Sequence, residues 1–169
     1  PSTLASADSR LDMAHAALDA IQRTQAVVEF DMKGTVLHAN QKFLDAMGYT
    51  LSEIVGCHHR LFCAPDYVAS QAYELFWETL RSGHPGQGEY MRLGRDGKPV
   101  WLQAAYNPVF DGEGRPIKVI KFATDITQSR LQQAENAAKI DAIDRVQAVI
   151  EFGLDGRILD ANARFLDTL

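Results

Sequence analysis

The sequence has few cysteines, no long apolar run and no block of basic residues. Two cysteines in 169 residues argue against a disulfide-stabilised scaffold, and we expect free thiols. No apolar stretch approaches the roughly 20 residues that span a bilayer, and the N-terminus lacks a signal-peptide core. The net charge of −5, with scattered basic residues, provides no surface for nucleic acid or an anionic membrane. We therefore expect a cytoplasmic globular protein that binds neither.

What the sequence does contain is an internal repeat. QAVVEFDMKGTVLHANQKFLDAM at 25–47 returns as QAVIEFGLDGRILDANARFLDTL at 147–169, with twelve identical residues among 23. LDAIQRTQ at 18–25 likewise matches IDAIDRVQ at 140–147, so a helix and the start of a domain recur together. We expect an N-terminal helix over 1–24, a complete domain over 25–127, a linking helix over 128–146 and the start of a second, truncated copy over 147–169. The truncated copy cannot bury its own apolar face.

The complete copy reads as two strands, several helices and three strands. The predicted strands are 27–31, 35–39, 88–93, 100–109 and 117–124. Asn40 is the expected N-cap of a helix that ends at Gly48, and short irregular or helical pieces fill 50–68. A longer helix over 69–82 is expected to bury one apolar side, made of Ala72, Leu75, Phe76 and Leu80. This order predicts an α+β fold.

Each flank carries a helix with a narrow apolar stripe. In the first, over 5–23, the stripe consists of Leu11, Ala14, Leu18 and Ile21. In the second, over 126–146, it consists of Leu131, Ala134, Ala138 and Ile143. A narrow stripe is typical of a helix that pairs with another helix, which predicts a homodimer through these segments. Packing of each stripe on its own domain is the alternative.

Several motifs together resemble a PAS domain over 25–127. They are GY-x-x-x-E-I-x-G at 48–56, the DG-type turns and the closing Asp125-Ile126-Thr127. More narrowly, AN-x-x-F-L-x-x-MGY, HH-x-x-FC, VWLQAAYNPV and KFATDIT are similar to the tandem PAS domains of soluble bacterial methyl-accepting chemotaxis transducers and biofilm-dispersion regulators. The resemblance implies a five-stranded antiparallel sheet with helices over one face, flanked by N- and C-terminal helices. It also implies a downstream signalling domain and a chemotaxis kinase complex in the full-length protein.

Strand alternation and the resemblance together select the residues that face the helices. Alternation puts Leu102, Ala104 and Tyr106 on one face of their strand. Comparison with related PAS domains implies that the inward set is Arg92, Leu102, Ala104, Tyr106, Lys121 and Ala123. Two alanines on one sheet face leave space, which favours a ligand cavity over a solid core.

The stretch GCHHRLFCAP at 56–65 gathers side chains that often bind metals, but its spacing matches no common zinc signature. Adjacent side chains diverge, so no metal site is predicted. Instead we expect the stretch to form a wall of the cavity, anchored inward by Leu61 and Phe62. The simpler alternative is that His58 and His59 only shape the loop.

The cofactor candidates are FAD and haem b. His59 and Trp77 match the flavin-binding PAS domain of aerotaxis receptors, whereas Cys63, Ala64 and Gly86 depart from it. Haem is a candidate because His59 could ligate iron, and Trp77 could equally be a core aromatic. The full set of candidate cofactor-binding residues is His59, Phe62, Trp77, Arg92, Ala104, Tyr106 and Asn40, although capping alone would explain Asn40.

These patterns indicate a sensory module rather than an enzyme, since no nucleophile with its base, phosphate loop or carboxylate pair is present. The module would detect a small ligand or the redox or oxygen state. Asp125 and Thr127 would couple the sheet to the helix that follows. The alternatives are a ligand-free dimerisation or spacer module, and the PAS input domain of a cyclic-dinucleotide enzyme or histidine kinase.

Overall fold

The computed structural model describes residues 2–167, with the side chains of residues 2–11 and 14 outside the description. The chain divides into two compact units after Thr127. The elements of the first unit are α1 (Ser2–Thr24), β1 (Ala26–Asp31), β2 (Val36–Ala39), α2 (Gln41–Met47), α3 (Leu51–Ile54), the 3-10 turn η1 (His59–Phe62), α4 (Pro65–Val68), α5 (Gln71–Arg81), β3 (Gly86–Leu93), η2 (Arg95–Gly97), β4 (Pro99–Phe110) and β5 (Pro116–Asp125). The second has α6 (Thr127–Val146), β6 (Ile150–Phe152), β7 (Ile158–Ala161) and α7 (Ala163–Leu166).

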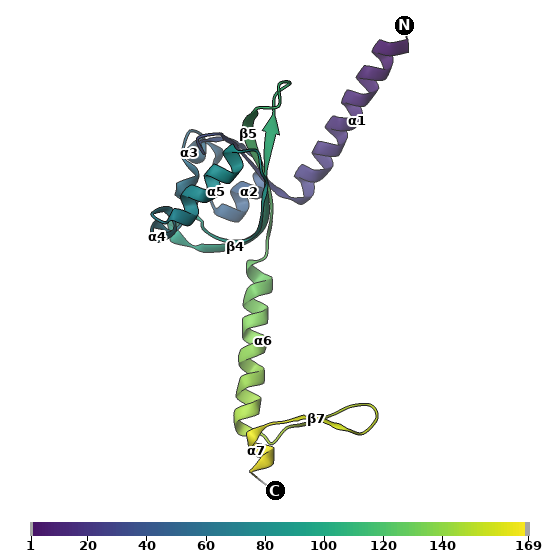
Figure 1. Ribbon diagram of the computed structural model, residues 1–169, viewed down its shortest axis with the longest axis vertical. Coiled ribbons are helices and arrows are strands. Elements are labelled where there is room, and N and C mark those ends of the chain that lie inside the picture. Colours follow the sequence, from purple (N-terminus) through teal and green to yellow (C-terminus); the bar gives the residue numbers. More distant parts are fainter. Residues whose placement is uncertain (1, 168–169) are drawn as a thin grey trace. The chain divides into compact units, whose positions relative to one another are not determined.

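The five strands of the first unit form one antiparallel sheet in the order β2-β1-β5-β4-β3. Helices α2 to α5 lie together on one side of this sheet (Figure 1). The predicted α+β fold, with two strands, helices and three strands, is therefore confirmed. Among the described residues no helix combines the length and the apolarity needed to cross a bilayer.

The core lies between the sheet and these helices. All six side chains predicted to face inward are at most 4% exposed; they are Arg92, Leu102, Ala104, Tyr106, Lys121 and Ala123. Strand alternation explains this result, because a sheet covered on one face buries every second side chain. The inward set contains two cations, which makes this core unusual.

The apolar face predicted for helix α5 was right for Phe76 and Leu80 and wrong for Ala72 and Leu75. Leu75 is 59% exposed, whereas Tyr73, Trp77 and Leu80 are buried. Positions i, i+4 and i+7 also lie on one side of a helix, and the larger aromatic rings take the buried side. The prediction that Leu61 anchors the preceding loop was also wrong, since its side chain is 38% exposed.

Asn40 caps α2 as predicted, accepting a hydrogen bond from Phe43 N at 3.0 Å. The helix ends at Gly48, whose φ of 75° is left-handed. Asn40 makes three further bonds: its side chain accepts from Val27 N at 2.9 Å and donates to Gln22 O and Gln25 O at 3.0 and 2.9 Å. One side chain thus joins α1, β1 and α2.

The second unit repeats this arrangement at Asn162. Its amide accepts from Val149 N at 3.0 Å and Phe165 N at 2.9 Å, and donates to Asp144 O at 3.0 Å and Gln147 O at 2.7 Å. Strands β6 and β7 pair antiparallel, and their register shifts between Glu151 and Phe152, as that of β1 and β2 does between Glu29 and Phe30. The apolar side chains of this unit remain exposed, among them Phe152, Ile158 and Leu166 at 59–63%.

The stripes on the flanking helices are exposed within the described residues. On α1, Leu18 and Ile21 are 47% and 39% exposed, and on α6, Leu131 and Ile143 are 58% and 47% exposed. The predicted stripe residues Leu11 and Ala14 lie outside the described side chains. The described stripe residues of both helices are therefore not buried on their own unit, and homodimer formation stays a prediction.

Candidate functional site

The turn η1 directs His59 into the core. His58 caps the turn, its Nδ1 accepting from Arg60 N at 3.1 Å. Because side chains three apart share one side of a 3-10 turn, His59 and Phe62 are both buried while Leu61 points outward. His59 therefore takes the anchoring role predicted for Leu61.

Both ring nitrogens of His59 contact tyrosine hydroxyls. Nδ1 lies 3.1 Å from the hydroxyl of Tyr73, and Nε2 lies 3.2 Å from that of Tyr106. The Tyr106 hydroxyl also accepts a hydrogen bond from Arg92 Nη2 at 3.3 Å. A neutral imidazole carries one N–H and one acceptor nitrogen, so one tyrosine hydroxyl donates to His59 and the other accepts from it.

Aromatic rings enclose this histidine. The imidazole stacks nearly parallel to Tyr73 and Phe76, at interplanar angles of 17° and 24°. Phe30, Trp77 and Tyr106 meet it edge-on, with ring centroids 5.3 to 5.8 Å away. The immediate surroundings of His59 are thus aromatic, and Tyr73, Trp77 and Tyr106 bring polar groups into the core.

The electrostatics of this interior favour a neutral histidine. Burial, and then the charges of Arg92 and Lys121, hold the pKa of His59 well below its usual range. Burial likewise lowers the pKa of Lys121, and Arg92 lowers it further. For Arg92 burial opposes the charge, but Tyr106 and Cys63 outweigh it and raise the pKa. Burial also raises the pKa of Tyr73 to about 12.

Two donors in the core have no hydrogen-bond partner among the described residues: Arg92 Nε and Trp77 Nε1. The indole N–H lies close enough to the Tyr73 hydroxyl to lower the pKa of that group, but the two do not form a hydrogen bond. Buried donors are normally paired. An interior with spare donors is suited to a ligand that supplies acceptor oxygens.

The structure brings together six of the seven predicted site residues as one buried cluster: His59, Phe62, Trp77, Arg92, Ala104 and Tyr106. The seventh, Asn40, lies apart at the helix junction, where its amide already makes four hydrogen bonds. Sequence reasoning missed Tyr73, and it expected Phe76 on the buried side of the helix without naming it as a site residue. Tyr73 precedes Trp77 by one helical turn, which was the signal that could have found it.

As the core stands, its residues do not fit haem, because the two nitrogens of His59 are both engaged by tyrosines. A tricyclic flavin ring would have to separate Phe76 from Tyr106, whose centroids are 4.9 Å apart. The donors of this core suit a flavin, since Arg92 Nε and Trp77 Nε1 could donate to its oxygens, but the packed rings leave no space for its ring system.

The two cysteines of GCHHRLFCAP have different surroundings, and the thiol of Cys63 lies beside a histidine ring of the stretch. Cys57 Sγ donates to Glu53 O at 3.3 Å, whereas Cys63 is buried with its Sγ 3.6 Å from His59 Nδ1. Within the part of the chain that the structure describes, no three His, Cys, Asp or Glu side chains gather as metal ligands would.

Two surface pockets lie near the core. One, of about 530 Å³, is lined by His58, Arg60, Tyr73 and Trp77, together with Lys33, Val68, Glu74, Glu78 and Arg81. Tyr73 and Trp77 line this pocket and also contact His59, so they link the pocket to the buried cluster. His58 and Arg60 thus line a pocket wall, although at the surface.

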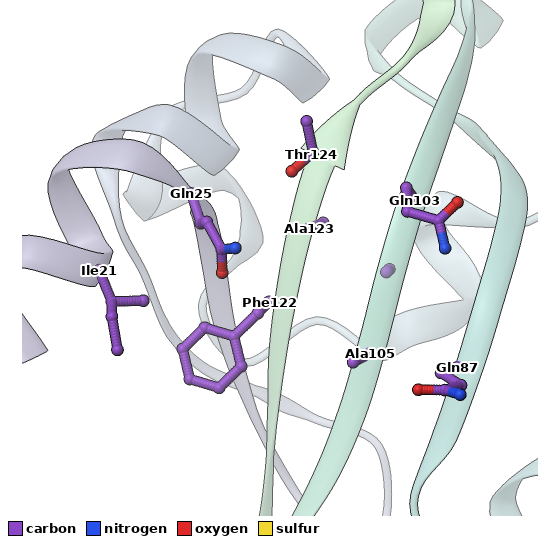
Figure 2. A pocket seen from close by; sticks show the side chains of 9 residues that line it. Ile21, Gln25, Gln87, Gln103, Ala105, Phe122, Ala123 and Thr124 are labelled. Atoms are coloured by element: carbon purple, nitrogen blue, oxygen red, sulfur yellow. The ribbon is translucent and has the colours of Figure 1, made fainter.

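The other pocket, of about 410 Å³, lies between the end of α1 and the sheet. Figure 2 shows Ile21 and Gln25 beside Phe122, with Gln103, Ala105 and Gln87 along the strands. These strand side chains alternate with the buried ones, so this pocket is on the outer face.

The residues predicted to couple the sheet to α6 are tied to strand β4. Asp125 Oδ1 accepts from Thr127 N at 2.8 Å, and Thr127 Oγ1 accepts from Trp101 N at 2.9 Å. Trp101 O accepts from Ile126 N at 2.8 Å. The first residue of α6 is therefore held by the strand that carries Tyr106.

Comparison with known proteins gives a consistent result. A family model described as PAS fold matches residues 36–123. The biofilm dispersion protein BdlA of Pseudomonas aeruginosa is 47% identical over 150 residues, which cover 89% of this chain and 36% of that protein. The aerotaxis receptor of Escherichia coli is 28% identical over 124 residues, which cover 73% of this chain and 24% of the receptor. The chain thus spans about a third or less of these relatives, which are named for signalling rather than catalysis.

Solved structures share the fold. A light-oxygen-voltage domain studied with a flavin analogue aligns with a TM-score of 0.57 at 25% identity, covering 72% of this chain and 96% of that one. The PAS domain of a protein from Colwellia psychrerythraea aligns with a TM-score of 0.59 at 19% identity, covering 69% of this chain and 98% of that one.

Proposed function

The chain belongs to the PAS family, and we propose that it is the cytoplasmic sensory module of a chemotaxis-type transducer, detecting a small ligand or the redox or oxygen state in its interior. The observation that carries this proposal is the buried cluster of His59, Tyr73, Tyr106 and Arg92. Polar groups are costly to bury, and a spacer would be more stable with an aliphatic core. The spare donors in this cluster support a ligand-binding role.

Transmission follows strand β4. A ligand that shifts Tyr106 acts on the strand whose backbone at Trp101 holds Thr127. Two arrangements of the sheet would then favour two arrangements of the start of α6, with Asp125 and Thr127 as the coupling residues. The response reaches a downstream signalling domain and, through it, a chemotaxis kinase complex.

The flanking helices and the second unit give the module its context. The exposed stripes of α1 and α6 pair in a homodimer, since narrow stripes do not stabilise isolated helices in water. Residues 147–169 are the start of a second PAS domain, as supported by the matching hydrogen bonds of Asn40 and Asn162. An output domain of the cyclic-dinucleotide or histidine-kinase type is the alternative to a chemotaxis one.

The test is to identify what the purified 169-residue protein carries. An absorbance spectrum detects flavin or haem, and mass spectrometry of the denatured protein detects a colourless ligand. The matched variants are His59→Ala and His58→Ala, since His59 is in the buried cluster and His58 caps the loop. We expect His59→Ala to lower ligand occupancy more than His58→Ala.

The second candidate, a ligand-free dimerisation or spacer module, is favoured by the exposed stripe of α6. It predicts that no small molecule accompanies the protein and that none stabilises it. Equal occupancy in both histidine variants would also contradict the sensory role of the His59 cluster.

A further inference from the structure

Two cations are buried on the same face of the sheet. Arg92 and Lys121 are 3% and 2% exposed, and both lie against Tyr106. Arg92 Nη2 donates to the Tyr106 hydroxyl at 3.3 Å, and Lys121 Nζ lies 4.8 Å from the centroid of the Tyr106 ring. Lys121 and Tyr106 are also direct partners across β4 and β5.

Among the described residues no anionic side chain pairs with these two groups, although Arg92 Nη1 donates to the backbone oxygen of Met91 at 3.0 Å. Apart from Tyr106, Arg92 lies over the rings of Tyr67 and Tyr90, and Lys121 lies over that of Phe43. Within residues 2–167 neither cation forms an ion pair, and Arg92 Nε has no partner at all.

Another lysine of the same strand shows the contrast. Lys118 is paired with Glu29 at 2.7 Å, although its side chain is 32% exposed and has water as an alternative. Lys121, which has no such access, has no carboxylate. Of these two lysines of β5, the part-exposed one has a carboxylate partner and the buried one has none among the described residues.

Deprotonation of Lys121 does not remove all of the uncompensated positive charge. Burial lowers the pKa of Lys121, but an arginine does not deprotonate in proteins. His59 cannot compensate, since a neutral imidazole has no negative charge. At least one full positive charge therefore remains in the core without a counter-charge, which is costly.

We propose that the interior binds the carboxylate of a small organic acid between Arg92, Lys121 and Tyr106. Arg92 Nε and Lys121 Nζ would each donate to a carboxylate oxygen, forming charge-assisted hydrogen bonds. The proposal rests on the sensory function above and names the chemical class of the ligand.

The neighbouring positions limit the size of the acid. Next to Tyr106 and Lys121 on the inner face are Ala104 and Ala123, which are partners across the two strands. Their methyl groups are the smallest side chains available on this face apart from glycine. Aromatic rings occupy the rest of the cluster, so the acid has a chain of a few carbons.

The experiment measures thermal unfolding and calorimetric binding of the 169-residue protein with sodium acetate, propionate and succinate. Sodium chloride and sodium phosphate at matched ionic strength are the reference salts. We expect a saturable rise in Tm with at least one of the three acids and not with the reference salts. Calorimetry in two buffers of different ionisation enthalpy should show proton uptake on binding, since the carboxylate favours charged Lys121.

Lys121→Met is the decisive variant, and Lys118→Met is its matched control. We expect Lys121→Met to raise the Tm without ligand, because a buried cation is replaced by an apolar chain of similar length. We also expect it to lose at least tenfold in affinity for the acid. Lys118→Met should bind the acid as the wild type does. If Lys121→Met does not fold, Tyr106→Phe, which removes one hydroxyl, should still weaken binding severalfold.

Three results would overturn the proposal: no saturable rise with any of the three acids, a rise that survives Lys121→Met, or an equal rise with phosphate. The sensory function fails separately. If a neutral or coloured ligand co-purifies while the acids do nothing, the protein is a sensor with another ligand class. If nothing co-purifies and nothing stabilises it, the sensory function itself is refuted.

Discussion

Replacing Asn40 by alanine removes a single side chain that joins α1, β1 and α2 by hydrogen bonds. Loss of the cap on α2 costs about 1 kcal/mol. The part-buried bonds to Val27 N and Gln25 O are worth about 1 kcal/mol each, whereas the exposed bond to Gln22 O contributes little. We expect a total loss of about 3 kcal/mol in the free energy of unfolding, which corresponds to a Tm lower by about 10 °C for a unit of this size.

The assay is urea unfolding followed by circular dichroism, with a thermal scan as the second readout. Asn162→Ala is the matched control, because Asn162 makes the same four hydrogen bonds in a unit whose apolar side chains are exposed. That variant should leave the main transition unchanged. Asn40→Asp keeps the two accepted bonds and loses the two donated ones, so its stability should lie between those of Asn40→Ala and the wild type.

The reasoning would be refuted if Asn40→Ala and Asn162→Ala had the same effect on the main transition. The four bonds would then contribute only locally at both sites. Wild-type stability in Asn40→Asp would show that the hydrogen bonds donated to Gln22 O and Gln25 O contribute nothing to the free energy of unfolding. Asn40 would then stabilise the fold only through the bonds that it accepts.

Three further predictions concern pH, the β1–β2 turn and self-association. Because the pKa of His59 is lowered in the folded state, only the unfolded chain takes up the imidazole proton below about pH 6.5. As the pH is lowered further, the free energy of unfolding should therefore decrease by about 1.4 kcal/mol per pH unit more in the wild type than in His59→Gln. The same pH dependence of urea unfolding in both proteins would contradict this. Gly34→Ala should destabilise by about 1–3 kcal/mol, because φ is +90° and a Cβ would lie 2.9 Å from two ring atoms; Gly112→Ala, which has open space, is the control in thermal scans. Replacing Leu18 and Ile21 by Asp should weaken the dimer in sedimentation runs while leaving the sheet folded; unchanged self-association would mean that these residues pack only on their own domain.

Local patterns in the sequence determined the elements and their order. Strand alternation placed Tyr106 on the same strand face as Leu102 and Ala104, and an Asn before an apolar helix predicted the cap at Asn40. These features depend on neighbours within a few residues, which the sequence displays directly. The buried side of α5 was predicted only in part, because helical spacing allowed two overlapping apolar sides and only contact with the sheet selected the one that carries Tyr73, Trp77 and Leu80.

Only the tertiary structure decided what the buried polar groups contact. The sequence places His59 in a loop, but its partners Tyr73 and Tyr106 are 14 and 47 residues away. The resemblance to PAS domains implies an inward Lys121, but not that no carboxylate among the described residues pairs with it. The physical reason is that periodicity reports which side of an element is buried, whereas hydrogen bonding and charge compensation depend on which side chains from distant elements meet there.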